Sequence, residues 1–353
     1  MIPKLWTLGS VFAFALILSP ILYLLQYWGK APPDIWQHLT QHLLLDISLN
    51  TLFLMFAVFA GTFVLGTLSG FLCGLCVFPG QKLFSKILIF PLAIPAYVFA
   101  FVFQDFFPNQ TSAYLKTSIT FILAFYPYVF LMSKAGFKNL SQSHFYAAKS
   151  LGHSTQKTFF KVLLPMSLPW ILGGCFLVLM ETLADFGTVS IFNYATFTTA
   201  IYSTWYSMFS LEAAAQLSLL LLLYVIALAL LESHFSKRPN TTSDSSPHTP
   251  IKFHLSKTWG YSATLFLSSV FSMAFIYPCI KLVHLSLFAQ ESASQSNWFS
   301  LAGNTFVIAI ITAMVICLLS ICLVYFRRMH KNWISFWMVK IAGIGYALSL
   351  IHI

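Results

Sequence analysis

The sequence predicts an all-α polytopic membrane protein. Hydrophobic residues make up 58% of its 353 positions and charged residues only 8%, a balance that excludes a soluble globular domain. Apolar stretches of about 17 to 25 residues, the length that a helix needs to cross a bilayer, recur along the whole chain. Because a helix satisfies its own backbone hydrogen bonds within lipid, we expect each of these stretches to be helical.

Eight apolar stretches are complete, and a ninth begins near residue 333. They cover residues 5–28, 49–76, 87–107, 117–137, 168–191, 213–231, 260–288 and 304–326. The first follows Lys4 and ends in interfacial aromatic residues such as Trp28. It is longer than the apolar core of a signal peptide and no small-residue cleavage site follows it, so we expect a retained helix.

Basic residues are distributed unevenly between the two sides of the predicted membrane. If the N-terminus is cytoplasmic, most of the 19 Lys and Arg residues fall in cytoplasmic loops, and Lys30, Lys116 and Lys281 fall outside. This is the positive-inside pattern of a protein surrounded by membrane lipid. It explains the net charge of +10 without a nucleic-acid partner, and it places the N-terminus and the basic loop near residue 150 in the cytoplasm.

That loop, residues 144–169, has the pattern of a helix, a turn and a second helix. Gly152 follows a run of good helix formers, at a position where a helix end favours a residue that tolerates positive φ. Ser154 or Thr155 can cap the next helix, which we expect Pro165 to end. The loop is therefore predicted to be ordered.

The same residues resemble the EAA loop of ABC importer permeases, whose form is Glu-Ala-Ala-x3-Gly-x9-Ile-x-Leu-Pro. In that family the loop is a coupling helix that docks into a groove on a cytoplasmic ATPase. The resemblance implies that the ATPase-coupling residues are Tyr146, Ala147, Ala148, Gly152, Val162, Leu164 and Pro165. Tyr146 stands where the family usually has Glu, and this difference bears on the affinity for the ATPase.

Further stretches resemble the fused iron(III) permeases of binding-protein-dependent importers, over nearly all of residues 1–347. They include Phe90-Pro-Leu-Ala-Ile-Pro-Ala-Tyr, Glu181-Thr-Leu-Ala-Asp-Phe-Gly-Thr and Thr196-Phe-Thr-Thr-Ala. The resemblance implies a type I, MetI-like permease fold with two homologous halves. It also implies two cytoplasmic ABC ATPase subunits, a periplasmic substrate-binding protein that delivers ferric ion, and a location in a bacterial inner membrane.

The predicted organisation has four parts. Residues 1–48 form a first transmembrane helix and a periplasmic segment, and residues 49–231 form the first permease domain. The polar, Ser/Thr/Pro-rich residues 232–258 have the composition of a flexible cytoplasmic linker. Residues 259–353 begin a second permease domain. The family continues with Pro-Gly after Ala347, so we expect this domain to be truncated and residues 348–353 not to be native.

Glu181 and Asp185 are the acidic residues deep within a predicted span. Ionisable groups are costly in hydrocarbon and usually face a cavity or a partner. Spaced four apart in a helix, the two would share one face. Two interpretations remain open: the pair lines or gates a translocation path, or it makes structural bonds to a neighbouring helix.

Prolines and glycines mark two further helices. Pro91 and Pro95 leave backbone carbonyls without helical partners, which predicts a kinked helix near the translocation path. Gly66, Gly70 and Gly74 lie on one face of the second span and predict close helix packing.

His38 and His42 share a face of a predicted short external helix that begins at Pro32 and Pro33. With Asp34 or Asp46 they could hold a metal ion. A polar stripe on an interfacial helix is the favoured interpretation, so no metal site or cofactor is predicted.

The sequence therefore predicts a permease subunit of an ATP-driven importer, with iron(III) as cargo. No Gly-x4-Gly-Lys-Ser/Thr motif occurs, so a separate subunit must hydrolyse ATP and the chain is not an enzyme. Permeases for thiamine, sulfate or polyamines share the coupling loop. An ion-coupled secondary transporter that uses Glu181 and Asp185, or a metalloenzyme that uses His38 and His42, would be a different class.

Overall fold

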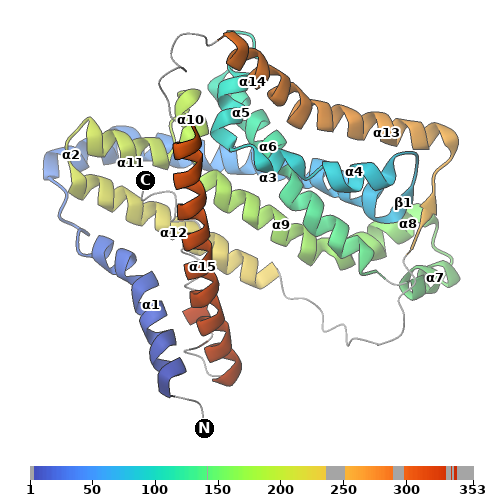
Figure 1. Ribbon diagram of the computed structural model, residues 1–353, viewed down its shortest axis with the longest axis horizontal. Coiled ribbons are helices and arrows are strands. Elements are labelled where there is room, and N and C mark those ends of the chain that lie inside the picture. Colours follow the sequence, from blue (N-terminus) through green and yellow to red (C-terminus); the bar gives the residue numbers. More distant parts are fainter. Residues whose placement is uncertain are drawn as a thin grey trace.

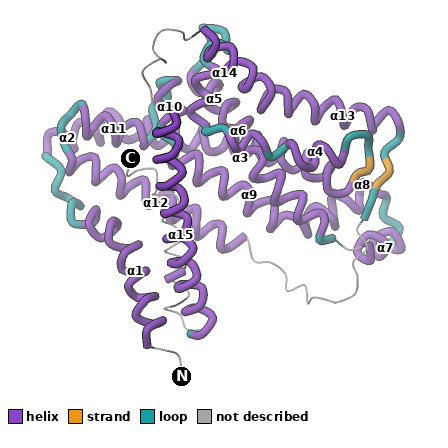
Figure 2. The backbone as a smooth tube through the Cα atoms, in the orientation of Figure 1, coloured by secondary structure: helices purple, strands orange, loops and turns teal. Residues whose placement is uncertain are grey.

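The computed structural model describes residues 4–140, 142–235, 251–288, 298–330, 335 and 338–339, almost all of them in helices (Figures 1 and 2). Three long helices form the centre of the molecule: α3 (Leu44–Leu75), α6 (Ala113–Lys138) and α9 (Leu164–Ala184). Helix α12 (Leu211–Phe235) packs against α9. The predicted all-α fold is confirmed.

The glycine face of α3 contacts α6, as predicted. A Cβ atom on Gly66 would lie 2.5 Å from the Cβ of Val129, and one on Gly70 would overlap the hydroxyl of Ser133. Ser133 Oγ donates a hydrogen bond across the interface to the carbonyl oxygen of Gly66, at 3.1 Å. The glycines of α3, which have no side chains, therefore let the two parallel backbones approach closely.

The predicted third span is broken into separate helices. Helix α4 (Gln81–Ile87) is followed by the 3₁₀ turn η2 (Phe90–Ala93) and by α5 (Ala96–Phe103), and the chain bends by 88° between η2 and α5. Pro91 is buried within η2, and Pro95 stands at the N-cap of α5. The predicted kink is confirmed, as a bend close to a right angle.

The prediction of a separate short external helix before the second span was wrong. Helix α2 (Pro33–His38) continues through the π-helical turn η1 (Leu39–Leu43) into α3, so one helix runs from Pro33 to Leu75. Leu39 and Ile47 are each 1% exposed and pack in one core cluster. The wide π turn absorbs one residue and keeps both side chains on the buried face.

The prediction that Pro165 ends a helix was also wrong. Helix α8 (Thr155–Thr158) continues through the π turn η3 (Phe159–Leu163) into α9, which makes one helix from Thr155 to Ala184. In the π turn the N–H of Leu164 donates to the carbonyl of Phe159. Pro165 then occupies the first turn of α9, where its missing N–H and its ring are tolerated.

The predicted span 168–191 ends early, because α9 stops at Ala184. Two short helices follow, α10 (Gly187–Ile191) and α11 (Phe197–Tyr206), before α12 begins. Helix α10 packs against α5, so the two interrupted parts of the bundle lie next to each other.

Beyond α12, the chain returns to the end of α3. Strand β2 (Phe253–His254) pairs in parallel with β1 (Cys76–Val77). Helix α13 (Lys257–Phe271), the π turn η4 (Ser272–Ile276) and α14 (Tyr277–Phe288) then form one long helix that packs against α4, η2, α5 and α6.

Residues at both ends of the segment predicted as a flexible linker, 232–258, belong to the packed helical structure. Helix α12 includes residues 232–235, and Ile251 is 3% exposed. Apolar side chains of residues 251, 253 and 255 pack in the core, which average composition over the whole segment did not reveal. Residues 236–250 lie outside the described residues.

Helix α1 (Lys4–Leu25) packs against α15 (Trp298–Met329), where Ala13 and Leu323 are buried together. In the part of the chain that the structure describes, six helices are long and apolar enough to cross a membrane, or seven if the bent pair counts as one span. Among these is α15, most of whose side chains are exposed. The span predicted from residue 333 falls mostly, and residues 348–353 fall wholly, outside the described residues.

Candidate functional site

The predicted coupling loop lies at one end of the helix bundle. Helix α7 (Gln142–Ser150) and helix α8 stand beside β1, at the right of Figure 1, whereas α2 and α11 lie at the opposite end. Basic residues gather at the same end, including Lys138 at the end of α6, Lys157 in α8 and Lys257 at the start of α13. The loop is thus part of the basic surface that the sequence pattern predicts.

Gly152 forms the turn between the two helices. Its φ is +79°, and the N–H of His153 donates to the carbonyl of Ala148 at 3.2 Å. The N–H of Gly152 donates to the carbonyl of Lys149 at 2.9 Å, which completes a Schellman motif. Ser154 rather than Thr155 is the N-cap, because its hydroxyl accepts from the N–H of Lys157 at 3.3 Å. The predicted helix, turn and helix are confirmed.

The residues of the EAA-like pattern divide into buried and exposed positions. Ala148 is 4% exposed and anchors α7, whereas Tyr146 is 59% exposed. Ala147, Gly152 and Pro165 are exposed, and Val162 and Leu164 are half-buried. Leu163, which the pattern leaves variable, is fully buried.

Two exposed apolar residues of the loop were missed by sequence reasoning. Leu151 is 79% exposed and Phe160 is 65% exposed. Large apolar side chains among lysines at the surface mark a site of interaction. In the sequence, these two residues stand directly before Gly152 and Lys161. Neither is a fixed position of the family motif, and an apolar residue next to a turn or a lysine was the signal that could have identified them.

The loop is cationic, with no Asp or Glu between residues 106 and 180. Lys149 spans the turn: its Nζ donates to the hydroxyl of Thr155 at 2.8 Å and lies 5.9 Å from the ring centre of Phe145. The first contact holds α7 against the start of α8, whereas the second lies within α7.

One helix connects the loop with Glu181. The carboxylate of Glu181, one turn before the end of α9, accepts a hydrogen bond from the hydroxyl of Tyr128 in α6 at 3.3 Å. A displacement of α8 would therefore be carried directly along the helix to the middle of the bundle.

Asp185 is the residue at which α9 ends, and its N–H still donates to the carbonyl of Glu181 at 3.0 Å. Its ψ of 129° ends α9, because the side chain bonds forward instead of continuing the helix. The carboxylate accepts from the N–H of Thr188 at 2.7 Å and from its hydroxyl at 3.2 Å. The carbonyl of Asp185 accepts from the hydroxyl of Thr198 at 2.9 Å.

Both acidic residues therefore have hydrogen-bond partners in neighbouring elements, and a role in lining or gating a path stays a prediction. Pro91 and Pro95 lie near the same region, because α5 packs on α10 and Gly187 touches Tyr97. The structure thus brings the two breaks in the bundle together, next to Asp185. Their place on a translocation path stays a prediction.

His38 and His42 lie beside each other, with ring centres 5.2 Å apart. Within the described ranges, no group of three or more His, Cys, Asp or Glu side chains is placed to hold a metal ion.

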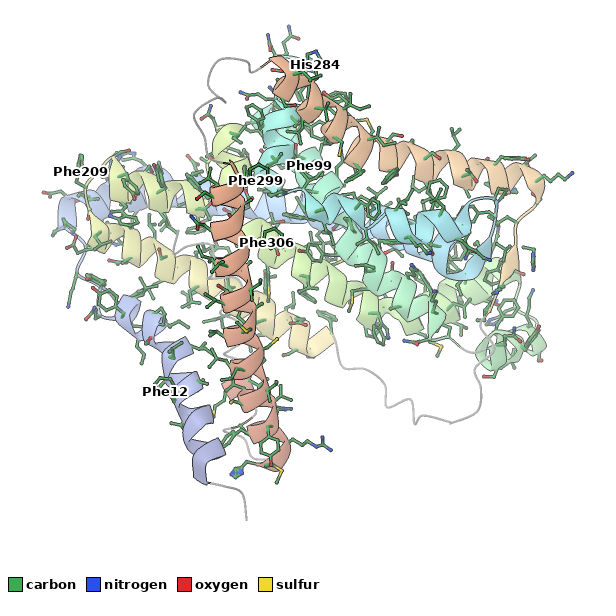
Figure 3. The ribbon with its side chains drawn as sticks, in the orientation of Figure 1. Phe12, Phe99, Phe209, His284, Phe299 and Phe306 are labelled. Atoms are coloured by element: carbon green, nitrogen blue, oxygen red, sulfur yellow. The ribbon has the colours of Figure 1, made fainter. Side chains whose placement is uncertain are left out.

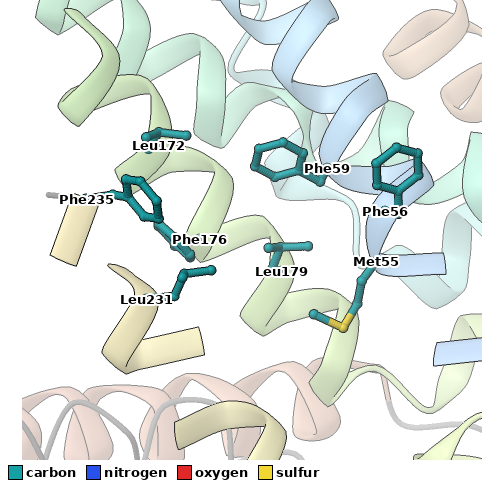
Figure 4. A pocket seen from close by; sticks show the side chains of 8 residues that line it. All are labelled: Met55, Phe56, Phe59, Leu172, Phe176, Leu179, Leu231 and Phe235. Carbon is teal, nitrogen blue, oxygen red and sulfur yellow. The ribbon is translucent and has the colours of Figure 1, made fainter. Parts of the chain in front are cut away.

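A cavity of about 350 Å³ opens between α3, α9 and α12 (Figure 4). Its lining is apolar and consists of Met55, Phe56, Phe59, Leu172, Phe176, Leu179, Leu231 and Phe235. Such a surface has no polar side chain to bind an ion.

Comparison with known proteins agrees with the predicted family and the helical membrane fold. Residues 66–238 match the sequence model of the family described as binding-protein-dependent transport system inner membrane component. The chain is 29% identical over 317 residues to the Fe(3+)-transport system permease protein FbpB 2 of Haemophilus influenzae. This alignment covers 86% of the chain and 62% of the relative, so the chain spans about three fifths of that protein's length.

Two other relatives match over shorter regions. A probable sulfate transport system permease protein of Chlorokybus atmophyticus is 26% identical, over 53% of the chain and 70% of the relative. The molybdenum transport system permease protein ModB of Haemophilus influenzae is 25% identical, over 44% of the chain and 75% of the relative. Residues 66–238 therefore belong to the family of binding-protein-dependent transport system inner membrane components.

Proposed function

We propose that the chain is the permease subunit of an ATP-driven importer and that residues 144–169 receive the movement of a cytoplasmic ATPase. The observation that carries the proposal is the geometry of the loop. An ordered helix and turn stand at the basic end of the bundle and continue without interruption into the helix that ends at Ala184. In this arrangement the N-terminus is cytoplasmic, in a bacterial inner membrane.

The loop supplies a surface that an ATPase subunit can grip. Tyr146, Leu151 and Phe160 present exposed apolar side chains, and Lys149 and Lys157 surround them with positive charge. Tyr146 takes the place of a carboxylate, so docking would depend on apolar contact and on acidic groups of the partner. Two ATPase subunits would engage a complete transporter of two such halves.

The helix from Thr155 to Ala184 would act as a lever. Closure of the ATPase pair would displace α7 and α8, and the continuous helix would carry the displacement to the breaks at Asp185 and Pro95. Because a bundle rearranges by movement of rigid helices about such breaks, this would alternate the access to the path between them.

Iron(III) is the proposed cargo, delivered by a periplasmic substrate-binding protein. The iron(III) permease relative supports this choice because it aligns with 86% of the chain, compared with 53% for the sulfate permease and 44% for the molybdenum permease. Sulfate is the second candidate on the same ground.

The test is uptake into membrane vesicles that contain the chain with its cognate ATPase and binding protein. Labelled iron(III), sulfate and molybdate are supplied separately, with ATP or with a non-hydrolysable analogue. We expect iron(III) to accumulate and ATP hydrolysis to be required. Accumulation that persists without ATP and collapses with the proton gradient would overturn the proposal in favour of an ion-coupled transporter. ATP-dependent accumulation of sulfate alone would correct the cargo.

A further inference from the structure

A short extended segment, residues 251–256, lies against the end of α3, and we name it the strap. Cys76 pairs with Phe253 and Val77 with His254 in a parallel ladder, and the N–H of Leu255 donates to the carbonyl of Val77 at 3.4 Å. Ile251 is 3% exposed, within the same core cluster as Leu140 and Leu163. The strap is thus held by its backbone and by a buried side chain.

Phe253 connects the strap with the predicted coupling helix. Its ring centre is 5.4 Å from that of Phe145 in α7, in an edge-to-face arrangement, and 6.5 Å from that of Phe71 in α3. Phe71 in turn contacts Phe159 in the π turn at 4.7 Å. Phe137 of α6 contacts both Phe71 and Phe159, so five rings from five separate elements form one cluster beneath the loop, which we name the aromatic cluster.

Helix α7 otherwise packs against α8 and η3, the elements that follow it directly in the chain. Of these neighbours η3 is tied to α3 through Phe159 and Phe71, and Phe253 supplies a second tie to α7 from outside the loop. The ring of Phe253 reaches Phe145 from more than a hundred residues away along the chain and is tied by the β-ladder to α3. The contact between Phe253 and Phe145 is therefore positioned to set where α7 stands.

We propose that Phe253 is a positioning residue for helix α7 and that the strap holds the coupling loop in register with the bundle. The strap also continues into α13, which is fixed to the same region: the hydroxyl of Thr264 donates to the carbonyl of Pro79 at 2.8 Å. A movement of α7 is thus passed to α3 and to α13 together. This functional part of the inference rests on the proposed function, whereas the positioning of α7 does not.

Tryptic cleavage after Lys149 tests the positioning without any partner protein. Cleavage in a helix requires local opening, and opening of α7 must break the Phe145–Phe253 contact. The assay uses open membrane fragments, which give trypsin access to the loop. We expect Phe253→Ala to accelerate this cleavage by about tenfold, the factor that corresponds to the loss of one contact between two aromatic rings. Phe253→Tyr, which keeps the ring, should be cleaved like the wild type.

Phe271→Ala is the matched control. Phe271 is also a half-buried ring in the part of the chain after the linker, with ring contacts to Phe90 at 6.4 Å and to Phe275 at 5.4 Å, but it has no ring contact with α7. It should leave cleavage after Lys149 unchanged. If Phe253→Ala yields too little folded protein, Phe253→Leu is measured in its place, and about threefold faster cleavage is expected.

Cleavage of the Phe253 variant at the wild-type rate would overturn the inference, as would equal acceleration by Phe271→Ala. The second readout is the ratio of cargo transported to ATP hydrolysed, which Phe253→Ala should lower several-fold while the ATPase still copurifies. A change in cleavage together with an unchanged ratio would overturn the role in coupling. If wild-type vesicles show no ATP-driven uptake but the cleavage difference is present, the proposed function fails and the positioning of α7 stands.

Discussion

Replacing Gly152 with Val is expected to disrupt the turn of the coupling loop without disturbing the rest of the bundle. The φ of Gly152 is +79°, and a Cβ atom there would meet nothing within 4 Å. The cost of a side chain is therefore conformational and not steric. For an ordinary L-residue the left-handed region costs about 1–2 kcal/mol, and a β-branched residue is at the upper end or beyond.

This cost acts on the turn alone. A penalty of about 1–2 kcal/mol changes the population of the Schellman turn by a factor of about 5–30. Helix α7 would then leave its position relative to α8 in a large fraction of molecules. Gly152→Asn is the matched control, because Asn adopts the left-handed conformation more readily and is common at this position of helix ends.

The assay is ATP-dependent uptake in vesicles, with the amount of membrane-inserted protein measured alongside. We expect Gly152→Val to insert normally and to lose most of its uptake, and Gly152→Asn to retain most of it. Wild-type uptake by the Val variant would refute the reasoning. Equal losses in both variants would also contradict it, since they would point to the side chain's bulk at the docking surface and not to the backbone.

Three further perturbations follow from the packing. Gly70→Leu should lower the unfolding free energy by about 1–3 kcal/mol or more, because the new side chain would collide with α6. Gly303→Ala is the control and should not destabilise the protein, because a Cβ atom at Gly303 meets nothing within 4 Å. Thermal unfolding in detergent measures both variants, and equal effects would contradict the close helix contact. Tyr128→Phe removes the 3.3 Å hydrogen bond to Glu181 and should cost about 1 kcal/mol in the same assay, and no loss would show that this bond contributes little. Asp105→Asn, which removes the ion pair with Lys281, should change the unfolding free energy by less than about 0.5 kcal/mol, because the side chain of Asp105 is 73% exposed. A larger loss would mean that the ion pair is shielded from water.

The helical fold and the ordered loop could be predicted because their signals are local. Hydropathy over about 20 residues marks a membrane helix, and a glycine followed by a serine or threonine marks a helix end and a new cap. The spacing of Gly66, Gly70 and Gly74 likewise revealed a contact, because three residues without side chains recur on one helix face.

The errors came where tertiary packing overrides a local signal. Pro165 would end an isolated helix, but the π turn just before it frees the backbone position that the proline ring needs. The span expected to reach residue 191 stops at Ala184, because the carboxylate of Asp185 bonds forward to Thr188 and the helix ends there. The average composition of residues 232–258 hid the apolar side chains that pack after Ile251.

The central claim is that the loop around Gly152 is the docking site of an ATPase, and photo-crosslinking from its most exposed apolar residue tests it directly. A photoreactive phenylalanine derivative replaces Leu151, which is 79% exposed, or Phe209, which is 89% exposed at the opposite end of the bundle (Figure 3). In intact cells that express the cognate ATPase, we expect irradiation to link the ATPase to the chain from position 151 and not from position 209. An ATPase that is copurified but never linked from position 151, or that is linked equally from both ends, would contradict the account.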